Sequence, residues 1–343
     1  MLTAQPLITL ILPIRNEAAH IERTLAALLA QDYPAQRMEI LVVDGMSDDA
    51  TREIVSQFTM HNSSFTIHLL DNPRRIVATA LNIGLAHARG DVIVRVDGHT
   101  EIAPDYVRRC VDLLQRTGAD NVGGRMQPVG QGAFGASVAV ATSSPFGVGD
   151  GRFHYSADEE WVDTVYLGAW PREVFQRIGG FDEELVRNQD DEFNYRLRKA
   201  GGRILLSPLI RSHYVNRSTP ASLWRQYYQY GYWKVRVLQK HPRQMQWRQF
   251  VPPLFVAGLL AGPPLGLLHP LFWTLWLSVV ALYALVNLCA SLWVASRQGW
   301  RHLLHLPLVF AILHSSYGLG FLIGLFAFAR RWSAPQPKPN SVD

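Results

Sequence analysis

The sequence predicts an α/β domain with a mostly parallel sheet flanked by helices, followed by a C-terminal region of transmembrane helices. Two observations lead to this prediction. Residues 1–248 of the 343-residue chain carry nearly all of its acidic residues, and short apolar runs alternate there with amphipathic segments. Residues 250–329 contain almost no charge. An alternation of strands and helices favours a parallel sheet that is covered on both faces.

The alternation is clearest in the first 116 residues. We expect apolar strands at 7–14, 39–44, 65–70 and 91–97, and helices at 17–30, 48–58, 76–88 and 104–116. In parallel sheets of this kind, ligands bind beyond the carboxyl ends of the strands. The polar residues that follow these strands are therefore the first candidates for function.

Residues 130–160 are rich in glycine, serine and other small residues. Gly147, Gly149 and Gly151 are spaced like the glycines of a dinucleotide-binding loop, but no strand precedes them and no helix signal follows. Two interpretations remain for this segment. It is either a mobile flap over a binding site or a plain surface loop.

The uncharged part of the chain contains three apolar stretches, at 250–268, 271–295 and 303–329. The second and third exceed the roughly 20 residues that cross a bilayer, whereas four prolines in the first allow a kinked span or a re-entrant segment. With a cytoplasmic N-terminal domain and three spans, Arg297 and Arg301 are cytoplasmic, in line with the positive-inside tendency, but Arg330 and Arg331 lie outside. An arrangement with two spans instead places Arg297 and Arg301 outside and Arg330 and Arg331 in the cytoplasm.

These stretches divide the chain into a catalytic domain (1–215), an amphipathic or interfacial linker (216–249), a transmembrane region of two to three helices (250–330) and a tail (331–343). In the linker, tryptophans and tyrosines interleave with basic residues, as in helices that lie at a membrane surface. The first residues lack a basic segment and a cleavage site, so the N-terminal domain is expected in the cytoplasm.

Overall charge and cysteine content restrict the classes of function. The net charge is +5, but no basic run of five or more residues occurs, so nucleic acid is not an expected partner. An anionic membrane surface would attract the basic residues that precede the apolar region. Two isolated cysteines, Cys110 and Cys289, form neither a disulfide framework nor a CxxC metal site.

Asp97 and His99 end the expected strand at 91–97. If the chain turns there, the carboxylate and the imidazole can both reach a divalent cation. Oxygen ligands suit Mg²⁺, and a histidine shifts the preference toward Mn²⁺. Such a cation would neutralise the charge that builds up on a diphosphate leaving group. A simple turn is the alternative interpretation.

Asp44 ends the strand at 39–44, and Ser47 follows three residues later. Turn and helix-capping chemistry explains Ser47 and the two aspartates after it. Asp44 could instead accept hydrogen bonds from a base or a ribose.

Asp190 and Asp191 lie in an acidic stretch that we expect to open a helix. Acidic residues in a first helical turn are favoured by the helix dipole alone. The functional interpretation is that one carboxylate acts as a general base. Upstream, Trp161, Tyr166 and Trp170 either form an aromatic platform for an acceptor sugar or pack in the core.

The order of these motifs is more specific than any one of them. PIRNE at 13–17 is followed by VVDGMSDDAT, which ends at Thr51, by NxGLAxARGD at 82–91, by the VDGH strand end, and by GGFDEELVRNQDDEFNYRL at 179–197. This pattern resembles the family 2 glycosyltransferases of the GT-A fold over roughly residues 7–215. The linker and the membrane region resemble those of succinoglycan-type exopolysaccharide glucosyltransferases.

The resemblance implies a site for a nucleotide-sugar. Its members would be Pro13, Glu17, Asp44, Ser47, Asn82 and Asp97. Asp97 and His99 correspond to the DxD metal motif of the family, with histidine in place of the second acid, which implies Mn²⁺ or Mg²⁺ as the cofactor.

The resemblance also implies the remaining roles. Asp190 corresponds to the catalytic base, although Gln189 stands where the family usually has glutamate. Trp170 and Asp191 are assigned to the acceptor. The QxxRW motif of processive synthases is absent, so the addition of a single sugar is expected.

The implied function is inverting transfer of a sugar, glucose, from a UDP-sugar to a polyprenyl-linked saccharide acceptor in exopolysaccharide or cell-surface glycan synthesis. The protein would be a multi-pass protein of the inner membrane with its catalytic domain in the cytoplasm, and membrane lipids and other polysaccharide-assembly proteins would be its partners. Alternatives are a polyprenyl-phosphate glycosyltransferase and an inactive membrane scaffold. A transporter is disfavoured because the apolar segments contain no charged residues.

Overall fold

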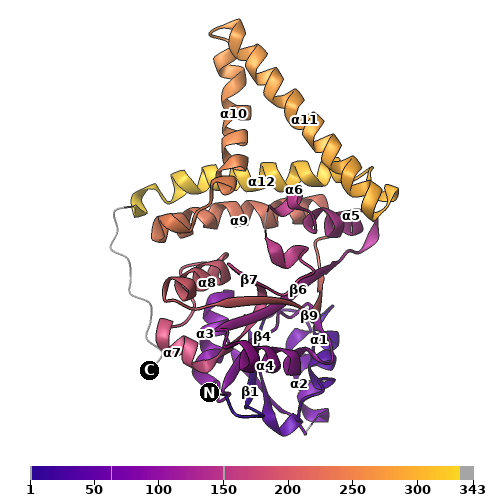
Figure 1. Cartoon of the computed structure of the whole chain (residues 1–343), viewed down its shortest axis with the longest axis vertical. Coiled ribbons are helices and arrows are strands. Elements are labelled where there is room, and N and C mark those ends of the chain that lie inside the picture. Colours follow the sequence, from indigo (N-terminus) through magenta and orange to yellow (C-terminus); the bar gives the residue numbers. More distant parts are fainter. Residues whose placement is uncertain (1, 63, 150, 333–343) are drawn as a thin grey trace. The chain divides into compact units, whose positions relative to one another are not determined.

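The computed structural model describes residues 2–62, 64–149 and 151–332 (Figure 1). Within these residues the chain forms two compact units. Residues 2–127 and 152–214 form the α/β unit, and residues 128–151 and 215–332 form the helical unit. The tail expected at 331–343 lies outside the described residues, apart from its first two.

The first half of the sheet is parallel. Its strands lie in the order β3, β2, β1, β4 and span Thr66–Asp71, Met38–Asp44, Ile8–Ile14 and Val92–Arg95. All four strands that the sequence predicted are confirmed. The register pairs Ile14 with Asp44, and Asp44 with Asp71, so the carboxyl ends of three strands meet at one edge.

The second half of the sheet contains the antiparallel strand pairs. It continues in the order β8, β6, β9, β5, and β7 pairs with β9. These strands span Tyr166–Pro171, Asn121–Val129, Ile204–Val215, Thr100–Ile102 and Glu160–Val162. Because β8 is antiparallel to both of its neighbours, β6 runs in the same direction as β4. The sheet is therefore mixed, with antiparallel strands added to the mostly parallel sheet that the sequence predicted.

Helices cover both faces of the sheet in the α/β unit. They are α1 (Ile21–Leu29), α2 (Thr51–His61), α3 (Val77–His87), α4 (Tyr106–Thr117), α7 (Arg172–Ile178) and α8 (Gln189–Lys199), with short 3₁₀ turns at Ala35–Arg37 and Arg152–His154. Alternate residues of β1 face opposite cores. Leu10 and Leu12 pack in one cluster with α1 and α4, and Ile11 packs in the other with α3. The expected helix that begins near Asp190 is confirmed as α8.

The helical unit consists of segments far apart in the sequence. Its helices are α5 (Gly132–Thr142), α6 (Pro145–Val148), α9 (Pro220–Lys240), α10 (Val251–Gly266), α11 (Pro270–Gln298) and α12 (Leu306–Ala327), with 3₁₀ turns at Pro242–Gln244, Trp247–Phe250, Trp300–His302 and Ala329–Arg331. Thr219 caps α9 in a capping box with Ser222.

Both interpretations of the glycine-rich segment are wrong for residues 132–148. This part forms α5 and α6, and Val138 and Ala141 pack in one core with Leu306 and Phe310 of α12. The segment is almost uniformly small and apolar, so it shows no amphipathic period from which a helix could be predicted.

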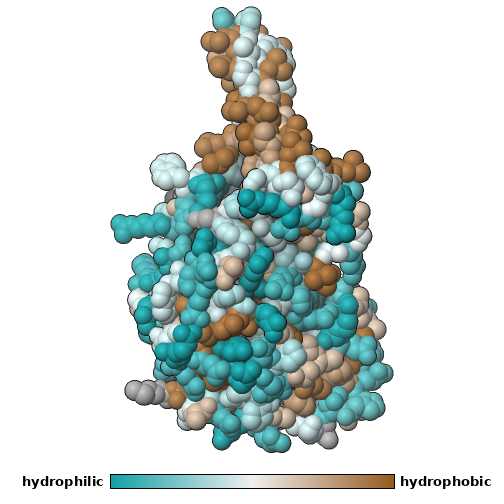
Figure 2. Space-filling model, turned by 45° about the vertical axis from the view of Figure 1, so that its right-hand side comes forward, coloured by the Kyte–Doolittle hydropathy of each residue, from teal (hydrophilic) through white to brown (hydrophobic). Residues whose placement is uncertain are grey.

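Three helices in the described part of the chain are long and apolar enough to cross a membrane. They span Trp247–Gly266, Pro270–Gln298 and Leu306–Ala327, and they match the three apolar stretches of the sequence. Figure 2 shows hydrophobic side chains gathered on the protrusion that α10 and α11 form, whereas most of the remaining visible surface is hydrophilic.

Candidate functional site

Three turns of the α/β unit have residues other than glycine with positive φ. Asn16 follows β1 with φ of 54°, Met46 follows β2 with φ of 56°, and Asn188 precedes α8 with φ of 63°. Positive φ is uncommon for residues other than glycine, and such strain concentrates at functional sites. All three turns lie next to residues for which the sequence predicted a function.

Asp44 is fully buried at the end of β2, and its own chain holds both of its oxygens. Ser47 donates its hydroxyl to Oδ1 over 2.5 Å and its backbone N–H to Oδ2 over 3.0 Å. Arg52 lies 2.6 Å from the same carboxylate and 2.9 Å from Asp71, at the end of β3. Direct contact between Asp44 and a base therefore requires Arg52 to move aside, so Asp44 acts first as a support for the turn.

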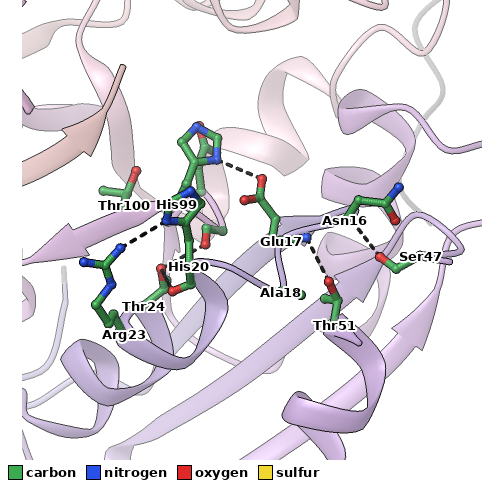
Figure 3. Close-up of polar contacts among 12 residues, drawn as sticks. Asn16, Glu17, Ala18, His20, Arg23, Thr24, Ser47, Thr51, His99 and Thr100 are labelled. Atoms are coloured by element: carbon green, nitrogen blue, oxygen red, sulfur yellow. Dashed lines mark hydrogen bonds and ion pairs between the residues drawn. The ribbon is translucent and has the colours of Figure 1, made fainter. Parts of the chain in front are cut away.

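The turns after β1, β2 and β4 form one polar network (Figure 3). The backbone N–H of Asn16 donates to the Ser47 hydroxyl over 2.8 Å, and that of Glu17 donates to the Thr51 hydroxyl over 2.8 Å. Glu17 Oε1 in turn lies 2.9 Å from Nδ1 of His99, after β4. The sequence thus brings Glu17, Ser47 and His99 together as expected. Pro13 is buried in β1, directly before this network.

Gly98 allows the turn after β4 to approach the Glu17 segment closely. A Cβ at this position would lie 2.8 Å from Cγ2 of Ile14 and 3.0 Å from Cγ of Glu17, closer than Cβ contacts normally come. Only glycine therefore fits the turn between Asp97 and His99 without displacing the Glu17 segment.

Asp97 and Asp190 are brought together by a residue that the sequence reasoning missed. Arg95, the last residue of β4, lies 2.8 Å and 3.1 Å from the two oxygens of Asp97 and 3.8 Å from Oδ2 of Asp190. The Asp97 side chain is 18% exposed and that of Asp190 is 47% exposed, so both carboxylates remain accessible. An arginine inside the apolar strand VIVRV was the signal that could have identified it.

The charge of Arg95 is fixed by its partners. Burial alone would lower the pKa of its guanidinium, but Asp97 and Asp190 outweigh that cost and raise the pKa above its usual value. Nearby, burial raises the pKa of the Tyr166 hydroxyl well above 10, and the charge of Asp97 adds to this effect. Tyr166 therefore stays a neutral hydroxyl, 2.8 Å from that of Thr100.

The side chains at this site fit a cation that is held partly by the protein and partly by a bound phosphate-containing molecule. Among the described residues, no group of three or more His, Cys, Asp or Glu side chains is placed to bind a metal. Asp97 and His99 would supply at most two ligands to such a cation, and the contact of Nδ1 of His99 with Glu17 leaves only Nε2 of that ring for a metal. Such a site suits a divalent cation that takes its other ligands from phosphate oxygens and water.

Asn82 has a different role from the nucleotide contact that we expected. Its amide donates to the carbonyl of Phe181 and to Glu183, and it accepts the N–H of Phe181 over 2.8 Å. Arg74 also pairs with Glu183. Asn82 is therefore used to hold the loop that leads from α7 to Asp190.

Trp170 is also corrected. It is 2% exposed in β8 and packs edge-on against Phe175, Phe181 and Phe193. The core interpretation is therefore correct for this residue, and its indole cannot serve as a platform for an acceptor sugar. Asp191, the other residue assigned to the acceptor, lies beside Asp190 in the first turn of α8 and donates its N–H to Asp190 Oδ1 over 2.9 Å.

Comparison with known proteins fits this geometry. The model of the glycosyl transferase family 2 matches residues 9–164. The succinoglycan biosynthesis protein ExoA of Rhizobium meliloti is 31% identical over 94% of this chain and 96% of its own. A Methanococcus voltae protein, a dolichyl N-acetyl-α-D-glucosaminyl phosphate 3-β-D-2,3-diacetamido-2,3-dideoxy-β-D-glucuronosyltransferase, is 26% identical over 93% of this chain and 97% of its own.

A solved structure shares the fold. It is the mannosyltransferase PcManGT from Pyrobaculum calidifontis in complex with GDP-Man and Mn²⁺, with a TM-score of 0.60, 21% identity, and coverage of 95% of this chain and 88% of that chain. The mixed sheet is thus that of the GT-A fold. Because the Rhizobium protein is 31% identical to this chain along almost its whole length, the chain belongs to the family 2 glycosyltransferases.

Proposed function

We propose that the protein adds one sugar, glucose, from a UDP-sugar to a polyprenyl-linked saccharide, with inversion at the anomeric carbon. The observation that supports this most directly is the contact of Arg95 with both Asp97 and Asp190. This contact supports the proposal because a candidate metal ligand and a candidate base would then serve one donor–acceptor pair.

On the donor side, Asp97 and His99 would hold a divalent cation, Mn²⁺ or Mg²⁺. When bound, the cation supplies charge stabilisation for the departing nucleoside diphosphate. Glu17 fixes the ring of His99 through Nδ1. Pro13, Ser47 and the buried Asp44 form and support the pocket for the nucleotide.

On the acceptor side, Asp190 accepts the proton of the attacking hydroxyl. The hydroxyl oxygen then forms a bond to the anomeric carbon from the face opposite the diphosphate, while the bond between that carbon and the diphosphate oxygen breaks. The bonding electrons leave with the nucleoside diphosphate, and an α-linked donor yields a β-glycoside. Arg95 holds Asp190 beside the donor and keeps Asp97 oriented.

The biological setting follows from the relatives. The Rhizobium relative is named for succinoglycan biosynthesis, and the Methanococcus relative is named for a dolichyl-phosphate-linked sugar acceptor. The three apolar helices would attach this chain to the inner membrane with its α/β unit in the cytoplasm. An anchored enzyme meets a lipid-linked acceptor in two dimensions, together with other polysaccharide-assembly proteins.

The test is a transfer assay with the full-length protein in detergent. Labelled UDP-glucose, UDP-N-acetylglucosamine and GDP-mannose are each offered with Mn²⁺ or Mg²⁺ and with either a polyprenyl-diphosphate saccharide or polyprenyl phosphate. We expect transfer from UDP-glucose to the saccharide with a β linkage. A single-sugar monophosphate lipid as product would instead favour the polyprenyl-phosphate alternative, and no transfer with any pair would favour the inactive scaffold.

Two neighbouring carboxylates provide the matched variants for the base. Asp190→Asn should lower kcat by about 10²–10⁴, the range for loss of a general base, with UDP binding retained. Asp191→Asn should raise the KM for the acceptor and leave kcat within a few-fold. Undiminished turnover by Asp190→Asn would exclude Asp190 as the base.

A further inference from the structure

The three apolar helices of the helical unit differ in their surroundings. Half of the apolar window of α12 is buried inside the protein, compared with 22% for Trp247–Gly266 and 17% for α11. Length and composition therefore give three candidate spans, but packing separates α12 from the other two.

α12 is bound along its length to α9, and the two helices run side by side (Figure 1). A Cβ at Gly231 of α9 would lie 2.0 Å from the carbonyl oxygen of Tyr317, and one at Gly320 of α12 would lie 2.0 Å from that of Tyr228. Further along, Gln239 donates to the carbonyl of Phe328 over 2.9 Å. Contact this close means that α12 cannot separate from α9 without breaking their packing.

α9 cannot cross a bilayer. It carries Arg225, Lys234, Arg236 and Lys240 together with several glutamines and tyrosines within 21 residues. Lysine and arginine are costly in the hydrocarbon core of a membrane, so four of them in one 21-residue helix oppose its insertion. Because α12 is packed onto this helix, the position of α12 relative to a membrane is tied to that of α9.

α10 and α11 leave this layer together. A Cβ at Gly318, in the middle of α12, would lie 2.4 Å from the carbonyl oxygen of Pro252, near the start of α10. Phe255 of α10 stacks on Tyr283 of α11 at 4.3 Å, and the Tyr283 hydroxyl lies 3.0 Å from Nδ1 of His314 in α12. Beyond these contacts the two helices pack mainly on each other.

The protruding arms are suited to lipid. Each extends for about 13 residues, or about 20 Å, beyond the Phe255–Tyr283 contact. Leu267 and Leu268, between the two helices, are 82% and 77% exposed, and Figure 2 shows hydrophobic surface along the protrusion. Residues 249–296 contain no Asp, Glu, Lys or Arg.

The charges lie at the opposite end of these arms. Arg248 precedes α10, Arg297 and Arg301 follow α11, and Arg330 and Arg331 follow α12. A hairpin that enters from one side and returns to it leaves all five arginines on that side. Three spans would place Arg330 and Arg331 across the membrane from Arg297 and Arg301, against the tendency of basic residues to share the cytoplasmic side.

We propose that α10 and α11 form a hairpin that inserts into the membrane from the side of the α/β unit, and that α12 lies in the membrane plane on α9. The partner of the exposed α10–α11 surface is the hydrocarbon of the bilayer. This inference depends on the membrane attachment proposed above. It differs from both arrangements, with two and with three spans, that the sequence left open.

Cysteine labelling of the full-length chain in sealed vesicles tests the hairpin. In a Cys289→Ala background, single cysteines replace Met60 in α2, Trp300 between α11 and α12, and Trp332 after α12, which are 71%, 62% and 50% exposed. A membrane-impermeant maleimide is added before and after permeabilisation. Met60→Cys reports the side of the α/β unit, and Cys110 stays as a buried, unlabelled thiol.

The labelling pattern separates the three arrangements. The hairpin predicts that Trp300→Cys and Trp332→Cys are labelled together with Met60→Cys in every vesicle preparation. Labelling of Trp300→Cys on the same side as Met60→Cys, with Trp332→Cys on the opposite side, would show three spans. Labelling of Trp332→Cys on the same side as Met60→Cys, with Trp300→Cys on the opposite side, would show that α11 and α12 cross. Either result overturns the proposal. Release of the unmodified protein by an alkaline wash would instead overturn the membrane attachment itself, while leaving the transferase chemistry untouched.

Discussion

Strand β2 carries a buried carboxylate at each end, and the two ends differ in what surrounds it. Glu39, at the amino end, is 2% exposed and lies 2.8 Å from Nε of Arg89. Asp44, at the carboxyl end, is fully buried and lies 2.6 Å from Arg52. Burial and ion pairing are thus alike at the two ends and do not reveal which one is functional.

At the amino end of β2, neighbouring groups of the protein satisfy the hydrogen-bonding oxygens of the carboxylate. Thr9 donates its hydroxyl to Glu39 over 2.5 Å, and the backbone N–H of Arg89 donates to the same oxygen over 2.6 Å. Gly90 donates its N–H to the Thr9 hydroxyl over 2.8 Å, and Asp91 accepts the N–H of Leu7 over 3.0 Å. The end of the NxGLAxARGD motif therefore joins three strands and has a structural role, although it contributes to the family resemblance.

The carboxyl end continues from Asp44 into partly exposed groups. Its network runs through Glu17 to His99, and next to it Arg95 holds Asp97 and Asp190 with accessible oxygens. A structural carboxylate is satisfied on every side, whereas a reactive one keeps a face for its ligand. The two ends thus differ in the exposure of their carboxylates rather than in burial or pairing at β2, and our proposal assigns the function to the carboxyl end.

The largest expected effect is that of Asp97→Asn. We expect kcat to fall by about 10³, in the range for loss of a residue that stabilises developing charge, because the cation loses its carboxylate ligand. The measurement is the initial rate of transfer over a titration with Mn²⁺. As the matched change at the amino end, Glu39→Gln should keep kcat within threefold. Equal losses in the two variants would contradict the distinction between the ends.

Arg95→Gln should have the next largest effect. We expect kcat to fall about 10- to 100-fold, because Asp97 and Asp190 lose the guanidinium group that orients both. UDP should still bind, because the network of Glu17 and Ser47 is separate from Arg95. Transfer rates and UDP affinity are measured together. Arg89→Gln is the control, since it removes the corresponding arginine of the amino end. An unchanged kcat for Arg95→Gln would mean that the contact does not position the carboxylates.

Asp44→Asn should act on the donor alone. We expect the KM for the nucleotide-sugar to rise about tenfold with kcat nearly unchanged, since the variant weakens charged hydrogen bonds to Ser47 and Arg52 that support the pocket. The measurement is a KM and kcat determination for donor and acceptor separately. A change confined to the acceptor KM would place Asp44 outside the donor pocket.

The sequence predicted the parallel half of the fold well, for a physical reason. Strands that are buried on both faces are apolar throughout, and the helices between them have one apolar face, so both leave a local pattern. The polar residues at the strand ends follow directly from that pattern. Asp97, His99 and Glu17 are therefore found near the expected edge of the sheet.

Other features depend on contacts between segments far apart in the sequence. Whether Trp170 faces a sugar or Phe193 is decided by which residues pack on β8, and the role of Asn82 is decided by the loop at 180–183. The helix α5 has no polar face because other helices surround it. None of these contacts leaves a local signal in the sequence.

The smallest expected effect concerns the stability of Glu39→Gln. Burial alone would raise the pKa of Glu39, but hydrogen bonds from Thr9 and from the backbone and side chain of Arg89 hold it below its usual 4.5. A lowered pKa in the folded state means that the unfolded state binds more protons as the solution is acidified. The stabilisation by Glu39 is thus complete above about pH 4.5 and is lost as the pH falls through the lower, folded-state pKa.

We therefore expect Glu39→Gln to cost about 1–2 kcal/mol at pH 7, as for a charge-assisted hydrogen bond, and less in acid. Thermal unfolding of the full-length protein in detergent, followed by tryptophan fluorescence between pH 3 and 7, measures the difference in Tm from the parent chain. Glu53→Gln, on the surface of α2, controls for the general effect of removing a carboxylate. A difference in Tm that stays constant across this range would show that the charge of Glu39 does not stabilise the amino end, and the contrast with the carboxyl end would then rest on activity alone.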